Sequence, residues 1–172
     1  MKKCIFLDRD GVLNEEQHDY VSRKENFIIR EGVAEGLILL KNAGYLLIVV
    51  TNQAGISKGL YTESLVREFH EILQNQCGNI IDDLYFSKHH PSYTSNSLLR
   101  KPDCLMLEKA MAKHEIDSSQ SYMIGDAERD VKAGMKAGVK TIHITGGKET
   151  TNLANWQFGS LLEASRFITR IL

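Results

Sequence analysis

The sequence predicts an α/β protein built on a doubly wound, mostly parallel sheet with helices on both faces. Short apolar runs alternate with segments of helical periodicity along the whole chain. One run, from Leu46 to Val50, is continuously apolar, which is typical of a strand buried on both faces of a parallel sheet. The length of 172 residues suits one domain, so we expect residues 1–172 to form a single unit.

The predicted strands are short runs bounded by polar residues or glycine. Cys4 to Leu7 begins the sheet and ends at Asp8. Trp156 and Phe158 are expected in a short late strand or a core contact. The other predicted strands are Leu46 to Val50, Asp83 to Phe86, Tyr122 to Ile124 and Thr141 to Ile144.

Helical spacing of apolar residues places helices between these strands. One helix covers Val33 to Lys41 and is closed by Gly44, and another starts after Thr62, a good N-cap residue. The two prolines, Pro91 and Pro102, bracket a long irregular stretch. The remaining predicted helices are Leu105 to His114, Ala127 to Ala137 and Leu161 to Ile171.

The composition indicates which kinds of partner and which cellular compartment to expect. The net charge is −1, from 21 basic and 22 acidic residues, so neither nucleic acid nor a membrane surface is an expected partner. The N-terminal segment lacks the apolar stretch of a signal peptide. Three widely spaced cysteines favour reduced thiols over a disulfide framework. We therefore expect a cytoplasmic protein, and we expect it to be a monomer.

Polar residues follow three of the predicted strands. Asp8 ends the first strand, Thr51 and Asn52 follow the second, and Asp126 lies just past the strand that starts at Tyr122. In open parallel sheets, ligands bind beyond the carboxyl ends of the strands. The sequence therefore predicts one site in which these three clusters converge.

The first cluster contains two carboxylates with one residue between them. Asp8 and Asp10 repel each other unless a cation or a shared proton offsets their charge, and Mg²⁺ suits one or two carboxylates together with a substrate phosphate. One carboxylate can attack phosphorus, and its neighbour can protonate the leaving alcohol and later activate water. Taken alone, this pattern fits a solvated strand end equally well.

The other clusters supply groups that a phosphate needs. Thr51-Asn52-Gln53 offers hydroxyl, amide and backbone donors, and Arg100-Lys101 offers positive charge. Asp126 stands at a strand–helix junction, where an aspartate is also a common N-cap. Separately, these residues would be read as a polar loop, a surface dibasic pair and a helix cap.

Together, the clusters resemble the four motifs of the haloacid-dehalogenase-like (HAD) phosphatases, in order and over nearly the whole chain. These motifs are Asp8-Arg9-Asp10-Gly11-Val12, Thr51-Asn52, Lys101-Pro102 and Gly125-Asp126-x-x-x-Asp130. Further segments resemble the heptose-bisphosphate phosphatase branch, which serves lipopolysaccharide and surface-heptose synthesis. They are His18-x-Tyr20-Val21, Glu31-Gly32-Val33, Thr51-Asn52-Gln53-Ala54-Gly55-Ile56, Gly59-x-Tyr61-Thr62-Glu63, His89-His90-Pro91 and Arg100-Lys101-Pro102.

This resemblance implies a magnesium-dependent phosphomonoester hydrolase that works through an aspartyl-phosphate intermediate. Asp8 would be the nucleophile and Asp10 the general acid and base. Asp8, the backbone carbonyl of Asp10 and the Asp126 carboxylate would hold Mg²⁺. Thr51 and Lys101 would stabilise the transferred phosphoryl group.

The implied substrate is D-glycero-D-manno-heptose 1,7-bisphosphate, which would lose its 7-phosphate. Histidinol phosphate or another small sugar phosphate is the alternative, although the histidinol-phosphatase branch departs from this sequence after the Thr-Asn-Gln segment. Arg100 would recognise the distal phosphate or the sugar. The other expected substrate-binding residues are His18, Asp19 and Tyr20 on a flap, together with Asn52 and Gln53.

The sequence departs from the family in the long loop and in the absence of a cap domain. The family usually carries structural zinc on Cys-x-His and Cys-x-Cys, but this chain has Ser87-Lys88-His89 and Ser97-Leu98-Leu99. A structural zinc wants four nitrogen or sulfur ligands, so we expect no zinc and a loop ordered by Pro91, Tyr93 and its own hydrogen bonds. Only about twenty residues separate Leu13 from Gly32, which fits a flap and not a domain.

Two other classes of protein share these features. DNA 3′-phosphatases have the same four motifs, but the neutral charge and the lack of a basic, aromatic-rich face disfavour them. A non-catalytic binding module could keep the fold. A degenerate module should have lost at least one key residue, yet all are present: Asp8, Asp10, Thr51, Lys101 and Asp126.

Overall fold

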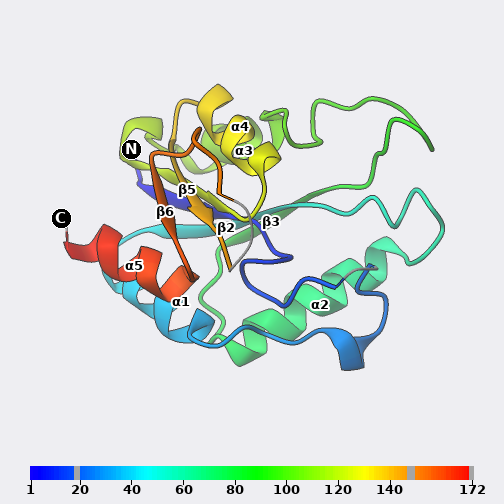
Figure 1. Ribbon diagram of the computed structural model, residues 1–172, viewed down its shortest axis with the longest axis horizontal. Coiled ribbons are helices and arrows are strands. Elements are labelled where there is room, and N and C mark those ends of the chain that lie inside the picture. The colour runs from blue at the N-terminus through cyan, green and yellow to red at the C-terminus, as the bar shows by residue number, and fades with distance from the viewer. Residues whose placement is uncertain (18–19, 147–149, 171–172) are drawn as a thin grey trace.

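The computed structural model describes residues 1–17, 20–146 and 150–170. A six-stranded sheet in the order β3-β2-β1-β4-β5-β6 forms the centre of the molecule, and every strand pairing in it is parallel (Figure 1). The predicted fold class is therefore confirmed. The strands are β1 Cys4–Leu7, β2 Leu46–Asn52, β3 Asp83–Ser87, β4 Tyr122–Gly125, β5 Lys140–Ile144 and β6 Trp156–Phe158.

Within the described residues, five α-helices cover the two faces of the sheet (Figure 1). Helices α1, α2 and α5 pack on one face, and α3 and α4 pack on the other. The helices are α1 Val33–Asn42, α2 Glu63–Gln76, α3 Leu105–His114, α4 Glu128–Lys136 and α5 Leu161–Arg170, with short 3₁₀ turns at Lys24–Asn26 and Ser118–Gln120. No helix of the described residues is long and apolar enough to span a membrane.

Strand β1 shows why the central strands read as continuous apolar runs. Ile5 and Leu7 belong to the core under α1, α2 and α5, whereas Cys4 and Phe6 belong to the core under α3 and α4. Successive side chains of a strand point to opposite faces, so a strand covered on both faces needs apolar residues at every position.

The ends of two helices follow the predicted capping chemistry. The Thr62 hydroxyl accepts a hydrogen bond from the Leu65 amide at 3.3 Å, and Gly44 takes the left-handed conformation after α1, with φ +83°. Helix α4 differs from the cap interpretation of Asp126. Its N-cap is Ala127, whose amide donates to Asp130 Oδ2 at 3.0 Å. Asp126 is therefore not the N-cap of α4.

Strand β2 runs two residues further than its apolar stretch predicts. Thr51 and Asn52 continue the strand because they pair with Phe86 and Ser87 of β3. Between Leu13 and Gly32, the described residues form one 3₁₀ turn and extended chain. Val21 and Phe27 of this segment are buried in the core. This segment therefore packs on the domain as a flap.

Candidate active site

The candidate site lies at the carboxyl ends of the central strands. β1 lies between β2 and β4, where the direction of winding reverses. In doubly wound sheets this switch point forms the ligand crevice. Asp8 follows β1, Thr51 is the second-last residue of β2, and Asp126 follows β4. The predicted convergence of these three residues is therefore present in the fold.

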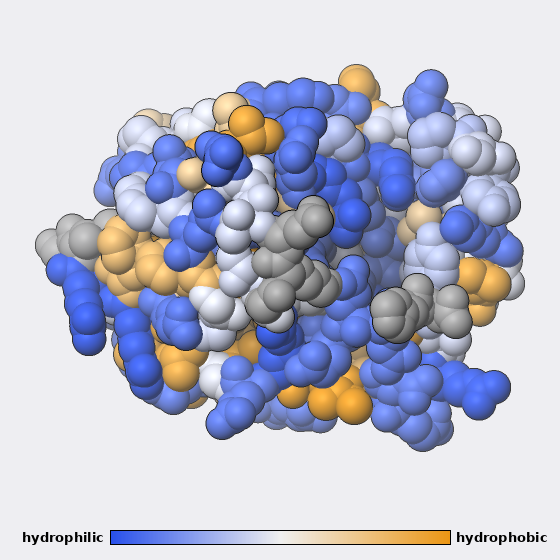
Figure 2. Space-filling model, in the orientation of Figure 1, coloured by the Kyte–Doolittle hydropathy of each residue, from blue (hydrophilic) through white to orange (hydrophobic). Residues whose placement is uncertain are grey.

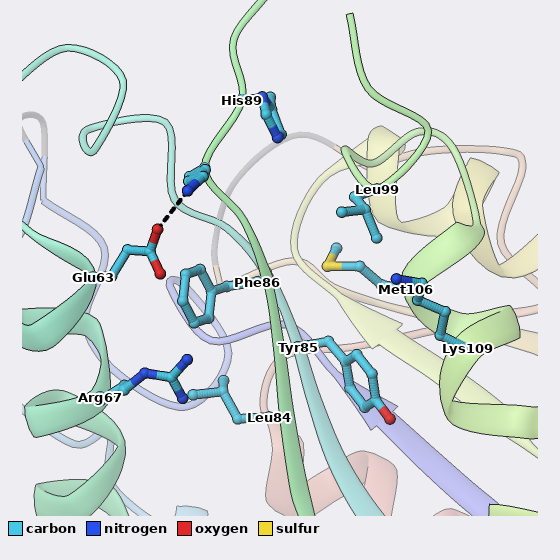
Figure 3. A pocket seen from close by; sticks show the side chains of 10 residues that line it. Glu63, Arg67, Leu84, Tyr85, Phe86, His89, Leu99, Met106 and Lys109 are labelled. Atoms are coloured by element: carbon cyan, nitrogen blue, oxygen red, sulfur yellow. Dashed lines mark hydrogen bonds and ion pairs between the residues drawn. The ribbon is translucent and has the colours of Figure 1, made fainter. Parts of the chain in front are cut away.

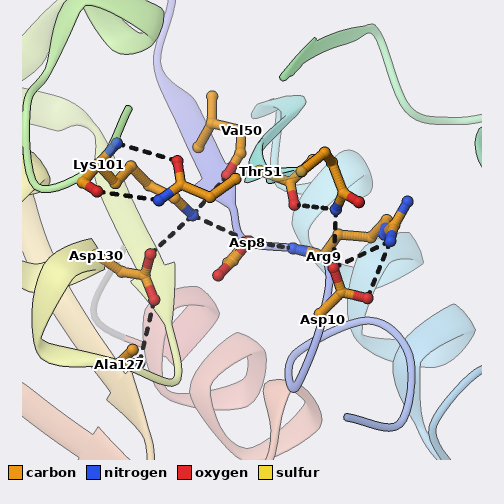
Figure 4. Close-up of polar contacts among 10 residues, drawn as sticks. Asp8, Arg9, Asp10, Val50, Thr51, Lys101, Ala127 and Asp130 are labelled. Carbon is orange, nitrogen blue, oxygen red and sulfur yellow. Dashed lines mark hydrogen bonds and ion pairs between the residues drawn. The ribbon is translucent and has the colours of Figure 1, made fainter. Parts of the chain in front are cut away.

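Lys101 stands at the centre of this site (Figure 4). Only 1% of the residue is exposed, and Nζ contacts Asp8 Oδ1 at 2.9 Å, Asp130 Oδ1 at 2.7 Å and the Val50 carbonyl at 2.8 Å. Burial lowers the pKa of Lys101, but the two carboxylates raise it by more, so the ammonium stays charged. Lys101 is therefore a buried positive charge held in place by two carboxylates and one carbonyl.

Three carboxylates gather around this point. Each of Asp8, Asp126 and Asp130 offers one oxygen, and the three oxygens lie within 4.8 Å of one another. Among the described residues, this is the only His, Cys, Asp or Glu cluster that could share a metal ion. Oxygen-only donors at this spacing suit a hard divalent cation such as Mg²⁺. The residues therefore fit the metal that the sequence predicts.

The pKa values of two of these carboxyls reflect their crowding. Burial, followed by the charge of Asp130, raises the pKa of Asp8 to about 6 even though Lys101 opposes the shift. Burial and the charges of Asp8 and Asp130 raise the pKa of Asp126 to about 7. A divalent cation at this cluster would offset the same repulsion.

The carboxylate of Asp10 faces a different set of groups (Figure 4). Arg9 contacts both of its oxygens at 3.0 Å, Asn14 donates to Oδ1 at 3.0 Å, and Gln53 donates to Oδ2 at 2.9 Å. Burial tends to raise the pKa of Asp10, but Arg9 and these hydrogen bonds lower it below its usual value. Asp10 is thus held as an anion, and its predicted part in metal binding depends on its backbone carbonyl.

Arg9 connects Asp10 to the hydrophobic core. The residue is only 2% exposed, and its guanidinium carbon lies 5.5 Å from the centroids of both Phe27 and Phe69. These two rings stack on each other, with centroids 4.6 Å apart and an interplanar angle of 1°. The sequence did not indicate this role, because a charged residue between two aspartates gives no sign that its side chain enters the core.

The Thr51-Asn52-Gln53 segment is tied into the site by its own hydrogen bonds. The Asn52 amide makes two bonds with the backbone of Lys101, at 2.9 and 3.0 Å, and so holds the segment that carries the lysine. Gln53, 1% exposed, donates to the Thr51 hydroxyl at 2.8 Å as well as to Asp10. The side chains of Asn52 and Gln53 therefore hold Lys101, Thr51 and Asp10 in place.

The long loop that presents Arg100 is ordered by polar and ring contacts. Arg100 donates to the His89 carbonyl at 3.3 Å, and the His90 carbonyl accepts from the Thr94 amide at 2.9 Å. The Tyr93 ring packs on His90 and lies 5.0 Å from Lys58 Nζ. Burial and the nearby charge of Arg129 lower the pKa of Arg100. Tyr93 thus contributes to the loop as the sequence predicts.

A cleft of about 460 Å³ lies beside Asp10, and positively charged side chains from several segments line it. Arg9, Lys58 and Arg129 line it, along with Tyr20 of the flap, whose ring lies 4.9 Å from Lys58 Nζ. The face seen in Figure 2 is largely hydrophilic around its central hollow. Two further predicted site residues, His18 and Asp19, lie outside the described residues.

A second hollow, of about 300 Å³, lies along the free edge of β3 (Figure 3). Phe86 and Leu84 line it on the side of α2, and Tyr85 and Met106 on the side of α3. None of the predicted site residues lines it, whereas Asp10, Asn52 and Gln53 line the 460 Å³ cleft. The 460 Å³ cleft is therefore the candidate substrate site.

Comparisons with known proteins agree with this geometry. Residues 98–160 match the HAD-hydrolase-like family model. A Helicobacter pylori protein named D-glycero-beta-D-manno-heptose-1,7-bisphosphate 7-phosphatase is 42% identical over 142 residues, which cover 80% of each chain. The chain belongs to the heptose-bisphosphate phosphatase family of HAD-like hydrolases. It is therefore an enzyme, a phosphoric monoester hydrolase of the kind that uses Mg²⁺.

Other members of this phosphatase family match over more of the chain. A relative of the same name from Escherichia coli K12 is 35% identical, covering 97% of this chain and 94% of its own. The fold is shared with the D,D-heptose 1,7-bisphosphate phosphatase of B. bronchiseptica, solved with magnesium and phosphate, at a TM-score of 0.89 and 20% identity over 99% of both chains.

Several residues of this phosphatase site were not assigned a role from the sequence. Asp130 was noted only as part of a motif, yet it pairs directly with Lys101. Arg129, the residue before Asp130, lines the cleft. Lys58 and Tyr61, in the loop after β2, also line the cleft. The Gly59-x-Tyr61-Thr62-Glu63 resemblance was the available signal for Tyr61, but it named no chemistry.

Proposed function

We propose that this protein removes the 7-phosphate of D-glycero-D-manno-heptose 1,7-bisphosphate, with Asp8 as the covalent nucleophile. The pairing of Asp8 with buried Lys101, beside two further carboxylates at the switch point of the sheet, is the observation that carries the proposal. The substrate named for the relatives gives the sugar its identity.

The contacts of Asp8 favour one of its oxygens as the nucleophile. Oδ1 accepts a hydrogen bond from the Arg9 amide at 2.7 Å and forms an ion pair with Lys101 Nζ at 2.9 Å. These bonds fix the plane of the carboxylate, and we infer that Oδ2 attacks. The new bond joins Oδ2 to phosphorus, and the bond between phosphorus and the sugar oxygen breaks.

Asp10 would handle the proton in both halves of the reaction. In its protonated form, Asp10 would give its proton to the departing sugar oxygen. The resulting carboxylate, which is the form that Arg9, Asn14 and Gln53 favour, would then accept a proton from the water that attacks the phosphorus of the aspartyl phosphate. Release of inorganic phosphate regenerates Asp8. Thr51 and Lys101 would stabilise the transferred phosphoryl group through a hydroxyl and a fixed positive charge.

Mg²⁺ would be held by the carboxylates of Asp8 and Asp126 and the backbone carbonyl of Asp10. When bound, it supplies positive charge that offsets the repulsion between these carboxylates and the incoming phosphate. Asp130 would remain paired with Lys101 and would keep that side chain in place.

The cations of the cleft suit a substrate with a second phosphate. Arg129 and Lys58 line the cleft, and both interact electrostatically with Arg100. We propose that Arg100 and Arg129 receive the distal phosphate, and that Tyr20, Asn52 and Gln53 border the sugar. A dianion beside a guanidinium pair gains charge-assisted hydrogen bonds that a monophosphate lacks at this position.

The nucleophile is tested by Asp8→Asn, because an amide is a far poorer nucleophile and metal ligand. The variant should lose turnover, and a rapidly quenched reaction of the wild-type enzyme should yield a phosphorylated peptide that contains Asp8. Asp103→Asn, at an exposed surface pair, is the matched control and should keep full activity. Wild-type turnover in Asp8→Asn would rule out the covalent mechanism.

The substrate is tested with a panel of phosphate esters. The panel holds both anomers of heptose 1,7-bisphosphate, histidinol phosphate and a 3′-phosphorylated oligonucleotide, and the highest kcat/KM should be for a heptose bisphosphate. A strong preference for histidinol phosphate or the oligonucleotide would reject the heptose substrate.

We also propose that the enzyme acts as a single-domain monomer. Light scattering measures its mass in solution and checks this proposal.

A further inference from the structure

A chain of hydrogen bonds leads from the rim of the cleft to Asp10. The Tyr61 hydroxyl donates to Gln53 Oε1 at 2.6 Å. Nε2 of the same amide donates to Asp10 Oδ2 at 2.9 Å and to the Thr51 hydroxyl at 2.8 Å. Gln53 is buried, with 1% of its surface exposed, so the protein supplies these partners in place of water.

The direction of this chain depends on Tyr61. A glutamine amide has an acceptor end and a donor end, and a half-turn of the amide would place Oε1 against the Asp10 carboxylate, acceptor against acceptor. A hydroxyl donor at Oε1 stabilises the orientation in which Nε2 faces Asp10. Burial raises the pKa of Tyr61, so its hydroxyl keeps the proton that it donates.

The backbone is shaped so that Tyr61 can reach Gln53. The ring lies directly on Gly55, where an added Cβ would stand 2.1 Å from Cε1 and 2.8 Å from the hydroxyl oxygen. A side chain at position 55 would therefore push the ring away from the amide. The Tyr20 ring, 6.1 Å from the Tyr61 ring between centroids, borders it on the side of the flap.

We propose that Tyr61 is a positioning residue for the phosphatase reaction. Through the Gln53 amide, Tyr61 orients Asp10 toward the leaving group. This inference rests on the proposed function, because it gives Asp10 its role in proton transfer. It also assigns Gln53 to the positioning of Asp10 and Thr51. Tyr61 would then influence the chemical step even though two other side chains separate it from the phosphorus.

The leaving group of the substrate distinguishes this role from a general structural one. A sugar oxygen needs a proton from Asp10 as it departs, whereas p-nitrophenolate leaves as a stable anion. The value of kcat/KM reports the steps up to the first irreversible one, the transfer to Asp8. Tyr61→Phe should therefore lower kcat/KM for heptose bisphosphate roughly tenfold, about the worth of one hydrogen bond, and for p-nitrophenyl phosphate less than about twofold.

A double-variant cycle tests whether Tyr61 acts through Gln53. If it does, Gln53→Leu combined with Tyr61→Phe should match Gln53→Leu alone to within about twofold. Effects that multiply in the double variant, or an equal loss of activity on both substrates in Tyr61→Phe, would overturn the proposal. If Gln53→Leu fails to fold, the comparison of the two substrates in Tyr61→Phe decides the question.

Two controls separate this inference from the proposed function. Tyr45→Phe removes a buried hydroxyl at the start of β2, at the end of the strand opposite the site, and should leave both substrates unaffected. Asp10→Asn should show the same dependence on the leaving group as Tyr61→Phe, but more strongly. A wild-type enzyme that hydrolyses neither ester contradicts the proposed function. A selective loss in Asp10→Asn without one in Tyr61→Phe contradicts only the positioning role.

Discussion

Replacing Asp130 with asparagine tests whether the buried ion pair holds the active site together. Asp130 Oδ1 lies 2.7 Å from Lys101 Nζ, and neither side chain has any exposed surface. Asparagine keeps the shape and can still accept the Ala127 amide through its oxygen, which preserves the cap of α4. The substitution therefore removes one buried negative charge and little else.

The expected cost is about 3 kcal/mol of unfolding free energy, at the low end of the range for breaking a buried pair. The low end applies because Lys101 keeps Asp8 at 2.9 Å and the Val50 carbonyl at 2.8 Å. For a chain of this size, 3 kcal/mol corresponds to a fall in Tm of roughly 6 to 12 °C. Activity should fall as well, since Lys101 would move toward its remaining carboxylate partner.

Urea unfolding followed by circular dichroism measures the stability, and the midpoint should fall with an unchanged slope. Asp103→Asn is the matched control, because Asp103 pairs with Lys136 at 2.6 Å on the surface, where the two side chains are 41% and 50% exposed. Such a pair contributes less than about 1 kcal/mol. Equal losses in the two variants would refute the claim that burial gives the Lys101–Asp130 pair its importance.

Four further outcomes are expected from the structure. Gly11→Ala should lower activity and Mg²⁺ affinity at least about tenfold, because the added Cβ would stand 2.0 Å from Asp126 Oδ2. Gly59 also has a positive φ but has open space around it, so Gly59→Ala should only lower the stability of the fold, by about 1 kcal/mol. Partial burial tends to raise the pKa of Asp83, but hydrogen bonds led by that from Lys113 lower it to about 2. Stability from this group is present above its ordinary pKa of 3.8 and lost as pH falls toward 2. Asp83→Asn should therefore cost about 1 kcal/mol at pH 7 and much less at pH 2, and an equal deficit at both pH values in urea titrations would contradict this. Removal of Mg²⁺ by a chelator should abolish turnover, and Mg²⁺ alone should restore it. Elemental analysis should find no stoichiometric zinc, and one equivalent would contradict the zinc-free loop.

The sequence predicted the parts of the site that depend on position along a strand. A polar residue that ends a buried run is visible in one dimension, so Asp8, Thr51 and Asp126 could be placed at one edge of the sheet. The partners of Lys101 were not predicted, because Asp130 and Val50 reach it from other segments and GDxxxD also fits a helix cap. Contacts of this kind depend on how loops return to the sheet, and no local periodicity encodes that path.

The same limit explains the secondary-structure differences. Short apolar runs located β1, β2 and β4, but the end of β2 was set by its pairing with β3, which extends the strand through Asn52. Pairing between strands is a tertiary property, and propensity yields to it.

The placement of Arg9 beside the stacked rings of Phe27 and Phe69 ties the reactivity of this enzyme to its interior packing. Substitutions at either ring would move the guanidinium that holds Asp10, although neither ring touches a substrate. Directed evolution of this enzyme toward new esters would therefore meet linked changes, in which a core substitution selected for stability also alters proton transfer. Libraries that vary Phe27, Phe69 and the residues at the rim of the cleft together would explore this linkage. Libraries that vary only the rim residues would leave the contacts between Arg9 and Asp10 unchanged.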